Sequence, residues 1–295
     1  MSIMAVGPAL DIDGPLPVKP EHSLLETMIR TPDGDLASVV VQEYGLDEVA
    51  RELNGVNVWG YPTGCSELWE PCSDGTFRTK SEESEQPTPR FDSYAVYKPL
   101  TCSGMGMSNE RAAELAVRIK RVLDATVSAG VERAIFQGVE GSSNPFIGDS
   151  AAADITPVPG TAVSPGVGLS LLENAIGATC RAGMIGATPA TIAALQAFPV
   201  GSESDRRLVT ANGTPVYSAD GLIGASTSDL AVAGDGEDWM VAHGPVQIWI
   251  GPARADTVRS ALDRSDNSLV FRAEQFVLSV FDTALQAAVL VDWAS

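Results

Sequence analysis

Few residues in this chain belong to the types that catalyse reactions, and their spacing fits no catalytic motif. The sequence holds two histidines, His22 and His243, among 295 residues. Neither belongs to a Gly-x-Ser-x-Gly elbow, a His-Glu-x-x-His pair or a Walker loop. His22 lies in a proline-rich stretch that is a poor place to hold geometry, and His243 precedes Gly244-Pro245 between two strand-like runs. We therefore expect no catalytic residue.

The residues that could bind a cofactor or a metal are equally incomplete. Gly166-Val167-Gly168 lacks the third glycine of a dinucleotide-binding turn. Asp11-Ile12-Asp13-Gly14 begins like a calcium loop but lacks its later oxygen ligands and closing glutamate. The remaining carboxylate clusters lie among Gly, Ser and Asn and are typical of solvated turns; they are Asp235/Glu237/Asp238 and Asp263/Asp266. We expect no cofactor and no metal.

The cysteines and the N-terminus indicate where the chain is made. The first residues have no basic segment and no long apolar run, so they do not form a secretory signal, and we expect synthesis in a cytoplasm. Thiols stay reduced there. The Cys65-x6-Cys72 spacing does not suit a zinc site. The sequence therefore predicts small reduced thiols at Cys65, Cys72, Cys102 and Cys180.

Composition excludes several classes of partner. The formal net charge of −19 repels phosphate backbones and anionic membranes, so neither sequence-specific DNA binding nor membrane docking is expected. No run of about 18 apolar residues occurs, so nothing is predicted to span a bilayer. Hydrophobic residues make up 44% of the chain, which is enough for a sizeable core.

The N-terminal third is unlike a compact domain. Residues 1–53 are rich in Pro and turn residues and predict an extended arm with little core of its own. Residues 54–100 place two strand candidates around a long polar excursion, which predicts a protruding β-hairpin, with a disordered insert as the alternative. Disordered segments are poor in aromatics. We therefore expect contacts between subunits at Trp59, Tyr61, Trp69, Phe77, Tyr94 and Tyr97.

The remaining residues show clearer periodicity. A helix is predicted over 108–129, where apolar side chains recur with the 3.6-residue period; Gly130 interrupts it, and a resumed helix at an angle is the reading for 131–137. Residues 161–245 predict a compact α/β unit with helices at 165–181 and 188–197 and a hairpin at Asn212-Gly213. An apolar strand is expected at 239–250, and at least two core strands at 268–293.

Several of these pieces, taken in order, resemble the major capsid proteins of tailed phages, a fold shared with encapsulin shells. The helix-to-loop passage VERAIFQGVEGSSNPFIGD is similar to the family's helix end; Glu132, Ala134, Phe136, Gly138, Pro145 and Gly148 carry the match. LVTANGTPVYSADGL looks like the hairpin of the family's axial domain. The tract from Asn267 to Val291 looks like its closing strands, with Arg272, Phe281 and Asp282 at familiar places. The order of the parts carries more weight than any single motif.

The resemblance implies an α+β protein with the tailed-phage major capsid fold. The implied parts are an N-terminal arm at 1–53, an extended β-hairpin loop at 54–100, a peripheral domain at 101–160 and 246–295 with a spine helix at 108–129, and an axial domain at 161–245.

The same resemblance implies a function. We expect a non-enzymatic major capsid protein that assembles into pentamers and hexamers, forming an icosahedral head around double-stranded DNA without sequence-specific binding. Portal, scaffold and decoration proteins are the implied further partners, and the virion capsid is the implied location. The alternatives are an encapsulin-like compartment, another virion structural protein or an α/β enzyme.

Overall fold

The computed structural model describes residues 23–25, 56–57, 89–103, 109–149, 153–195, 208–224, 230, 232–257 and 268–294. The elements along the chain are β1 (Val56–Asn57), β2 (Arg90–Phe91), β3 (Tyr94–Ser103), α3 (Asn109–Gln137), α4 (Pro165–Ala178), β4 (Met184–Ala187), α5 (Pro189–Ala194), β5 (Leu208–Val209), β6 (Pro215–Ser218), the 3-10 turn η2 (Asp220–Leu222), β7 (Glu237–His243), β8 (Val246–Ile250), β9 (Arg254–Thr257), β10 (Ser268–Phe281) and β11 (Gln286–Asp292).

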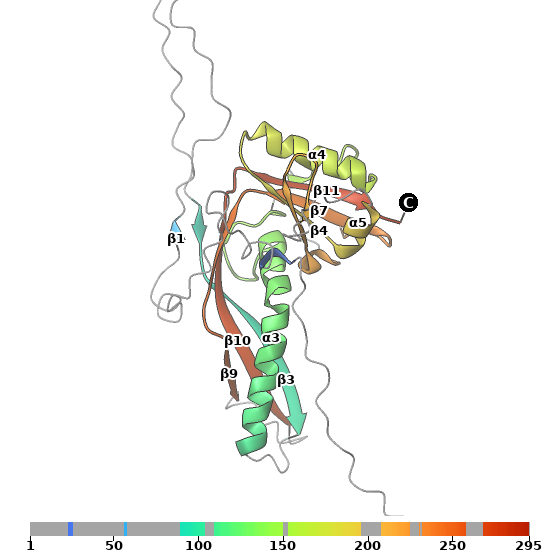
Figure 1. Ribbon diagram of the computed structural model, residues 1–295. Coiled ribbons are helices and arrows are strands. Elements are labelled where there is room, and N and C mark those ends of the chain that lie inside the picture. Colours follow the sequence, from blue (N-terminus) through green and yellow to red (C-terminus); the bar gives the residue numbers. More distant parts are fainter. Residues whose placement is uncertain are drawn as a thin grey trace, which may run out of the picture.

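Helix α3 is the longest helix among the described residues and runs alongside β3 and β10 (Figure 1). Its 29 residues span about 44 Å at 1.5 Å per residue. The sequence predicted a helix over 108–129 that Gly130 interrupts, with 131–137 as a resumed helix; the predicted interruption is wrong, since α3 continues through Gly130 to Gln137 as one helix. A Cβ on Gly130 would lie 2.8 Å from Cγ1 of Val96. The glycine therefore lets the helix pass close to β3 and does not break it.

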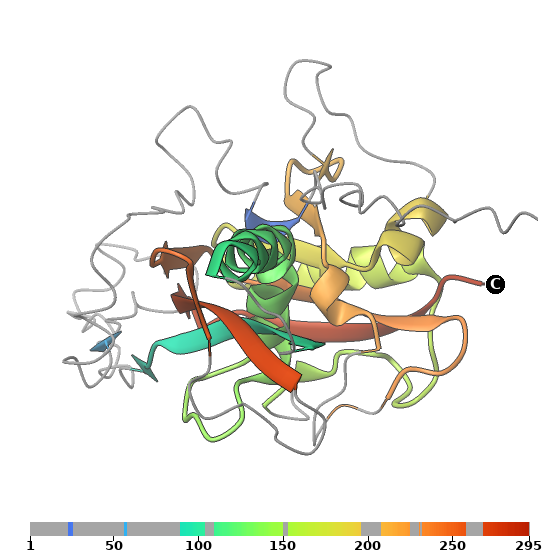
Figure 2. The same cartoon turned by 90° about the horizontal axis from the view of Figure 1, so that it is seen from below.

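The first large sheet lies against α3. Its strand order is β3-β10-β8, β9 also pairs with β10, and every pairing is antiparallel. Phe271 and Ala273 of β10 form a core cluster with Ile119 and Leu123 of α3. In Figure 2 the helix is seen nearly end-on, over the blue-green strand β3 and the red strand β10. One face of this sheet is thus buried by the helix.

The second large sheet is covered on both faces. Its order is β11-β7-β4-β6-β5; β4 and β6 run parallel, and the other neighbours are antiparallel. Met240 and Ala242 point into the core cluster that includes α4, while Trp239 and Val241 point into the cluster that includes α3. This alternation is what a strand buried between two layers requires.

Several local predictions are confirmed. Helices α4 and α5 begin at Pro165 and Pro189, the first helical positions that the sequence indicated. The turn at Asn212-Gly213 joins β5 to β6, which pair antiparallel, and Gly213 has the positive φ of 86° that such a turn needs. The 54–100 hairpin stays a prediction: β1 pairs antiparallel with β2, whereas the strand candidate that closes this range is β3, which pairs with β10.

The last quarter of the chain is divided differently from the expectation. The apolar, strand-like tract at 239–250 forms two strands, β7 and β8, which separate at Gly244-Pro245 and enter different sheets. The closing tract holds two strands, as predicted, but β11 pairs with β7 and not with the strands beside α3. Its run of five buried residues, 287–291, needs cover on both faces, and only the second sheet provides it. The domain boundaries themselves stay a prediction.

One short piece of the N-terminal arm belongs to the main core. Leu24 and Leu25 are buried in the cluster that also holds Val131 and Ile135 of α3. Residues 23–25 are thus buried in a core that other segments form, and the expected arm at 1–53 stays a prediction. The rest of residues 1–53 lies outside the described residues.

Candidate functional site

A buried carboxylate on α3 joins three separate segments of the chain. Glu132 is 2% exposed, and its Oε1 accepts hydrogen bonds from the Leu24 backbone N–H and the Ser128 hydroxyl, both at 3.0 Å. Its Oε2 accepts from the Gly221 N–H at 2.9 Å. We name this arrangement of Glu132, Ser128, Leu24, Leu25 and Gly221 the Glu132 node. It holds the N-terminal segment and η2 to the same turn of the helix.

Glycine at position 221 makes this close approach possible. A Cβ there would lie 2.5 Å from the Ala129 carbonyl oxygen and 2.7 Å from the Arg133 backbone nitrogen. Both are backbone atoms of α3 and have little room to move. Any residue larger than glycine would push η2 away from the helix and lengthen the bond to Glu132.

The electrostatics of the Glu132 node follow from its burial. Loss of solvent raises the pKa of Glu132 above its usual range, and the nearby charge of Asp220 raises it further. The hydrogen bonds from Gly221, Leu24 and Ser128 lower the pKa but do not cancel the effect of burial. The carboxylate is therefore well bonded yet still costly to keep charged.

Among the described residues, no helix lies over the opposite face of the first sheet. On β3 the side chains of Tyr97, Pro99 and Thr101 alternate with those that pack toward α3, and all three are exposed. On the neighbouring strand, Arg272 Nη2 pairs with Glu274 Oε2 at 2.8 Å. We name these five residues the open sheet face. Tyr97 is 61% exposed, which is high for a large aromatic side chain, and it pairs in register with Glu274.

Two of the six predicted contact residues, Tyr97 and Tyr94, lie in the described part of the chain, and they differ in exposure. Tyr97 is on the surface, where a second molecule could cover it. Tyr94 is 8% exposed, lies in the core of its own chain and shares a hydrogen bond of 3.1 Å with the Ser279 hydroxyl. Burial raises its pKa. Tyr94 therefore has an internal packing role. The other four predicted contacts, Trp59, Tyr61, Trp69 and Phe77, lie outside the described residues.

His243 is buried and serves packing. Its Nδ1 bonds the Gly244 carbonyl oxygen at 2.7 Å, which leaves Nε2 to accept from the Tyr217 hydroxyl at 2.9 Å. Burial lowers the pKa of His243 to about 4, so the ring stays neutral. A histidine fully enclosed in this way has no route to a substrate. His22 lies outside the described residues.

Two carboxylates of the predicted cluster at 235–238 accept hydrogen bonds that stabilise local structure. Glu237 accepts a hydrogen bond from the Gly234 N–H within its turn, at 3.0 Å. Asp238 accepts from the Thr188 hydroxyl at 2.6 Å, which anchors the residue that caps α5. Asp263 and Asp266 fall outside the part of the chain that the structure describes. Within the described ranges, no group of three or more His, Cys, Asp or Glu side chains is placed to hold a metal ion.

One cysteine departs from the sequence prediction. Cys180 is disulfide-bonded, whereas a reduced thiol was expected from the absence of a secretory signal. The prediction rested on the compartment of synthesis, and nothing in the local sequence marks this residue as paired.

Sequence reasoning also missed the Glu132 node. Glu132 was noted only as part of a family-like passage, and its bonding partners lie 108 and 89 residues away along the chain. A signal did exist: a glutamate stands inside the apolar run Val131 to Phe136, on the buried side of a helix.

Within the described residues, no helix has the length and apolar character that a membrane span requires.

Comparisons with known proteins concern the fold. No protein-family model matches the chain, and no curated protein matches it in sequence. Among solved structures, the capsid of an empty GTA particle superposes with a TM-score of 0.51 at 15% identity, covering 98% of this chain and 96% of that one. The capsid of cyanophage Pam1 gives a TM-score of 0.47 at 12% identity over the whole of both chains.

This chain has the tailed-phage major capsid fold. The match to the GTA capsid extends over nearly the full length of both chains, so the arrangement of α3 and the two sheets is that of a capsid subunit. A structure of the SrpI encapsulin from Synechococcus elongatus is also similar, with a TM-score of 0.41 at 13% identity, covering 71% of this chain and 78% of that one. The α+β class and the capsid fold predicted from the sequence are confirmed.

Proposed function

We propose that this chain is a major capsid protein of a tailed phage, which assembles into pentamers and hexamers and forms an icosahedral head around double-stranded DNA. The observation that carries the proposal is the full-length superposition on the capsid of a GTA particle. We further propose that the described fold acts structurally and catalyses nothing, because its only described histidine is enclosed and its described carboxylates serve packing and turns.

The surface of the single chain supports assembly. The open sheet face presents Tyr97 beside an ion pair, on a sheet whose other face packs against α3. Exposed aromatic area of this kind is typical of protein interfaces. We propose that a neighbouring copy covers this face, and that the predicted loop at 54–100 and the arm beyond residues 23–25 reach adjacent subunits.

The Glu132 node has a defined place in this proposal. It fixes the arm to its own subunit at Leu24 and Leu25, so that the residues preceding this point start from a constant position in every copy. A fixed starting point lowers the entropy that the preceding residues lose when they bind a neighbour. The proposed domains are the arm, the loop, a peripheral unit around α3 and an axial unit around α4.

The charge of the chain is compatible with the cargo. A net charge of −19 disfavours tight binding to packaged DNA, so the DNA is proposed to be enclosed and not read. Portal, scaffold and decoration proteins are the proposed further partners, and the virion the proposed location after synthesis in the host cytoplasm.

The test is to express the full chain and to measure its molar mass by light scattering across a concentration series. The proposal predicts capsomers or closed particles. A stable monomer at high concentration would contradict it. Particles taken from the producing cells should contain nuclease-protected DNA; particles filled with protein cargo and no DNA would favour an encapsulin-like compartment.

A further inference from the structure

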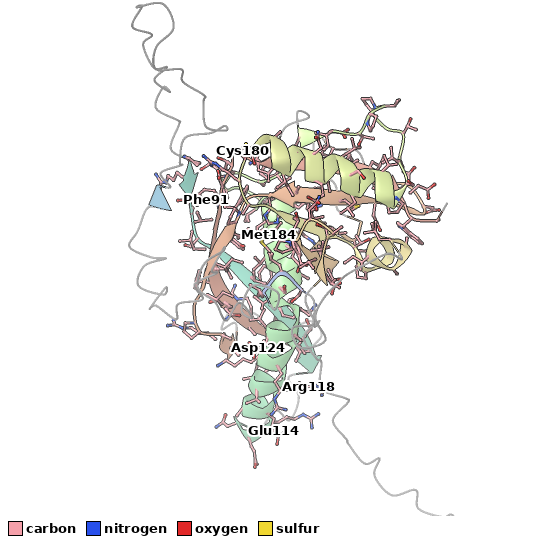
Figure 3. The ribbon with its side chains drawn as sticks, turned by 45° about the horizontal axis from the view of Figure 1, so that its top comes forward. Phe91, Glu114, Arg118, Asp124, Cys180 and Met184 are labelled. Atoms are coloured by element: carbon pink, nitrogen blue, oxygen red, sulfur yellow. The ribbon has the colours of Figure 1, made fainter. Side chains whose placement is uncertain are left out.

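Strand β3 forms one edge of the first sheet. Its ten residues pair with β10 along their whole length, and within the described residues no strand pairs with its other side. It runs from the end of the molecule at which Phe91 lies toward the end at which Arg118 and Glu114 of α3 lie (Figure 3). An edge of this length presents a row of N–H and C=O groups to which a strand of another chain can add.

The other sheet edges in the described part of the chain are covered or short. The outer side of β11 is bonded by residues 154–163, through the Ile155 N–H to the Ala288 carbonyl oxygen at 2.9 Å and the Val163 N–H to the Leu290 carbonyl oxygen at 3.0 Å. Strands β5, β8 and β9 have two, five and four residues. Covering an edge and keeping it short both prevent sheets from joining edge to edge. The ten-residue edge of β3 therefore needs another form of protection.

The direction of the backbone groups in β3 follows from one hydrogen bond on the far side of β10. The Phe276 carbonyl oxygen accepts from the Gly251 N–H at 2.9 Å, so the backbone of Phe276 is directed toward β8. Successive residues of a strand direct these groups to opposite sides. Gln275 is therefore directed toward β3, where its partner in register is Val96. Val96 is thus one of the residues through which β3 bonds β10.

Pro99 lies in the middle of the outer edge. From Val96, steps of two lead along the residues that bond β10, so the residues between them, Tyr97, Pro99 and Thr101, direct their backbone groups outward. All three are exposed. Proline has no N–H, and it is confined in sheets to such positions because inside the ladder it would cost a bond. Its ring stands where the hydrogen of another residue would be and points at any strand that approaches.

The pairing that Pro99 hinders most is that of two β3 strands from two copies of the chain. A twofold axis through this residue would pair the strands antiparallel, with Pro99 opposite Pro99 of the second copy and Tyr97 opposite Thr101. The central pair would lack both of its hydrogen bonds, and the two rings would meet. In any other register the bond that Pro99 cannot donate is still lost, and its ring still stands between the strands.

We propose that Pro99 is a specificity-determining residue, which prevents a second copy of the chain from adding to the outer edge of β3, so that two copies cannot join their first sheets edge to edge. Lys98 beside it is exposed and supports the same role, because charged side chains on edge strands also oppose pairing. The inference goes beyond the proposed function, since it concerns any two copies, whether or not they form a shell. Contacts through the open sheet face stay possible, because they need no backbone bond at the edge.

The test restores the missing donor in the full-length chain. Pro99→Thr and Pro99→Ala differ in their side chains but share a backbone N–H at the edge. Neither removes a bond to β10, so both should keep the fold, which circular dichroism and the melting temperature check. Light scattering over a dilution series measures the molar mass. We expect both variants to dimerise at a concentration about tenfold or more below that at which the wild type associates, because the centred pairing regains two hydrogen bonds.

Amide hydrogen exchange and two further variants identify the edge as the contact. In the associated variants the N–H groups of Tyr97 and Thr101 should exchange more slowly than in the wild type, because they donate to the second strand. Thr101→Val is the matched control: it adds an apolar β-branched side chain to the same strand and keeps Pro99, so it should associate like the wild type. The double variant Pro99→Thr/Thr101→Pro places a proline two residues along the edge and should return association to the wild-type level.

The outcomes separate this inference from the proposed shell. Association of Pro99→Thr and Pro99→Ala at the wild-type concentration would overturn it. An equal rise in Thr101→Val would make surface apolarity the cause, and association without slower exchange at Tyr97 and Thr101 would place the contact elsewhere; either result sinks the proposal. Loss of the fold in both Pro99 variants would contradict the outward direction of this residue and overturn it too. The shell is tested by whether the wild type forms particles, so each can fail without the other.

Discussion

The carboxylate of Glu132 is the side chain on which the arm, α3 and η2 meet. Its three donors come from Leu24, Ser128 and Gly221, so loss of the carboxylate leaves two backbone N–H groups buried without partners. An unsatisfied buried donor costs about 1–3 kcal/mol. The energetic role of this residue is therefore larger than one hydrogen bond suggests.

The substitution Glu132→Gln tests the charge at this position. Burial raises the pKa of Glu132 in the folded state, so the folded protein binds the proton more tightly than the unfolded chain. Its contribution to stability is then largest below the unfolded pKa of about 4.3 and is lost as the pH rises through the folded pKa. In Glu132→Gln we expect the unfolding free energy to show no such loss as the pH rises through the folded pKa of Glu132.

At a pH below the unfolded pKa of about 4.3, Glu132→Gln should also be less stable than the wild type, by about 1–3 kcal/mol. The reason is that the amide NH₂ of the glutamine faces a backbone N–H donor. Denaturant unfolding at a series of pH values measures both effects. Ser128→Ala is the control, since it keeps the carboxylate and should keep a pH dependence of the same sign. An unchanged pH profile in Glu132→Gln would contradict the account of a buried charge.

His243 affects the pH dependence of stability in the opposite direction to Glu132. Its folded pKa of about 4 lies below the unfolded value of about 6.5, so its contribution is complete above pH 6.5 and is lost as the pH falls toward 4. The full effect is at most roughly 3 kcal/mol. We expect His243→Gln to flatten the unfolding free energy over this window. If the variant and the wild type lose stability in parallel between pH 6.5 and 4, the histidine is not neutral in the folded protein.

At the level of elements, the contact of η2 with α3 depends on glycine. Gly221→Ala places a methyl group 2.5 Å from the Ala129 carbonyl oxygen. We expect a loss of about 1–3 kcal/mol in the free energy of unfolding, as for other overpacked sites, and faster amide exchange at Gly221. Gly166→Ala is the matched control, because nothing lies within 4 Å of its added Cβ. Equal behaviour of the two variants would show that η2 does not rest on the helix.

The elements that the sequence predicted well are those that local residues determine. The proline starts of α4 and α5 and the Asn212-Gly213 turn carry their own signals, and they were found. The pairing of β11 with β7 was missed because the two strands are separated by more than 40 residues and either sheet could bury an apolar strand. The burial of Glu132 was missed for the same reason, since two of its hydrogen-bond donors, Leu24 and Gly221, are distant in sequence.

At the scale of the whole molecule, the open sheet face is a surface over which no described helix lies, and it presents an exposed Tyr97. Tyr97→Ala should leave the unfolding free energy within about 0.5 kcal/mol, since surface substitutions have small effects. It should nevertheless raise the protein concentration needed for assembly. Tyr97→Phe is the control, because it keeps the ring and should assemble like the wild type. Light scattering during assembly measures the difference; normal assembly of Tyr97→Ala would remove this face from the interface.

An electron-microscopy reconstruction of the purified particle tests the central claim most directly. The account predicts a closed icosahedral lattice of pentamers and hexamers, in which each open sheet face is covered by a neighbouring copy. A particle or monomer in which Tyr97 stays solvated and no lattice of neighbours exists would contradict it.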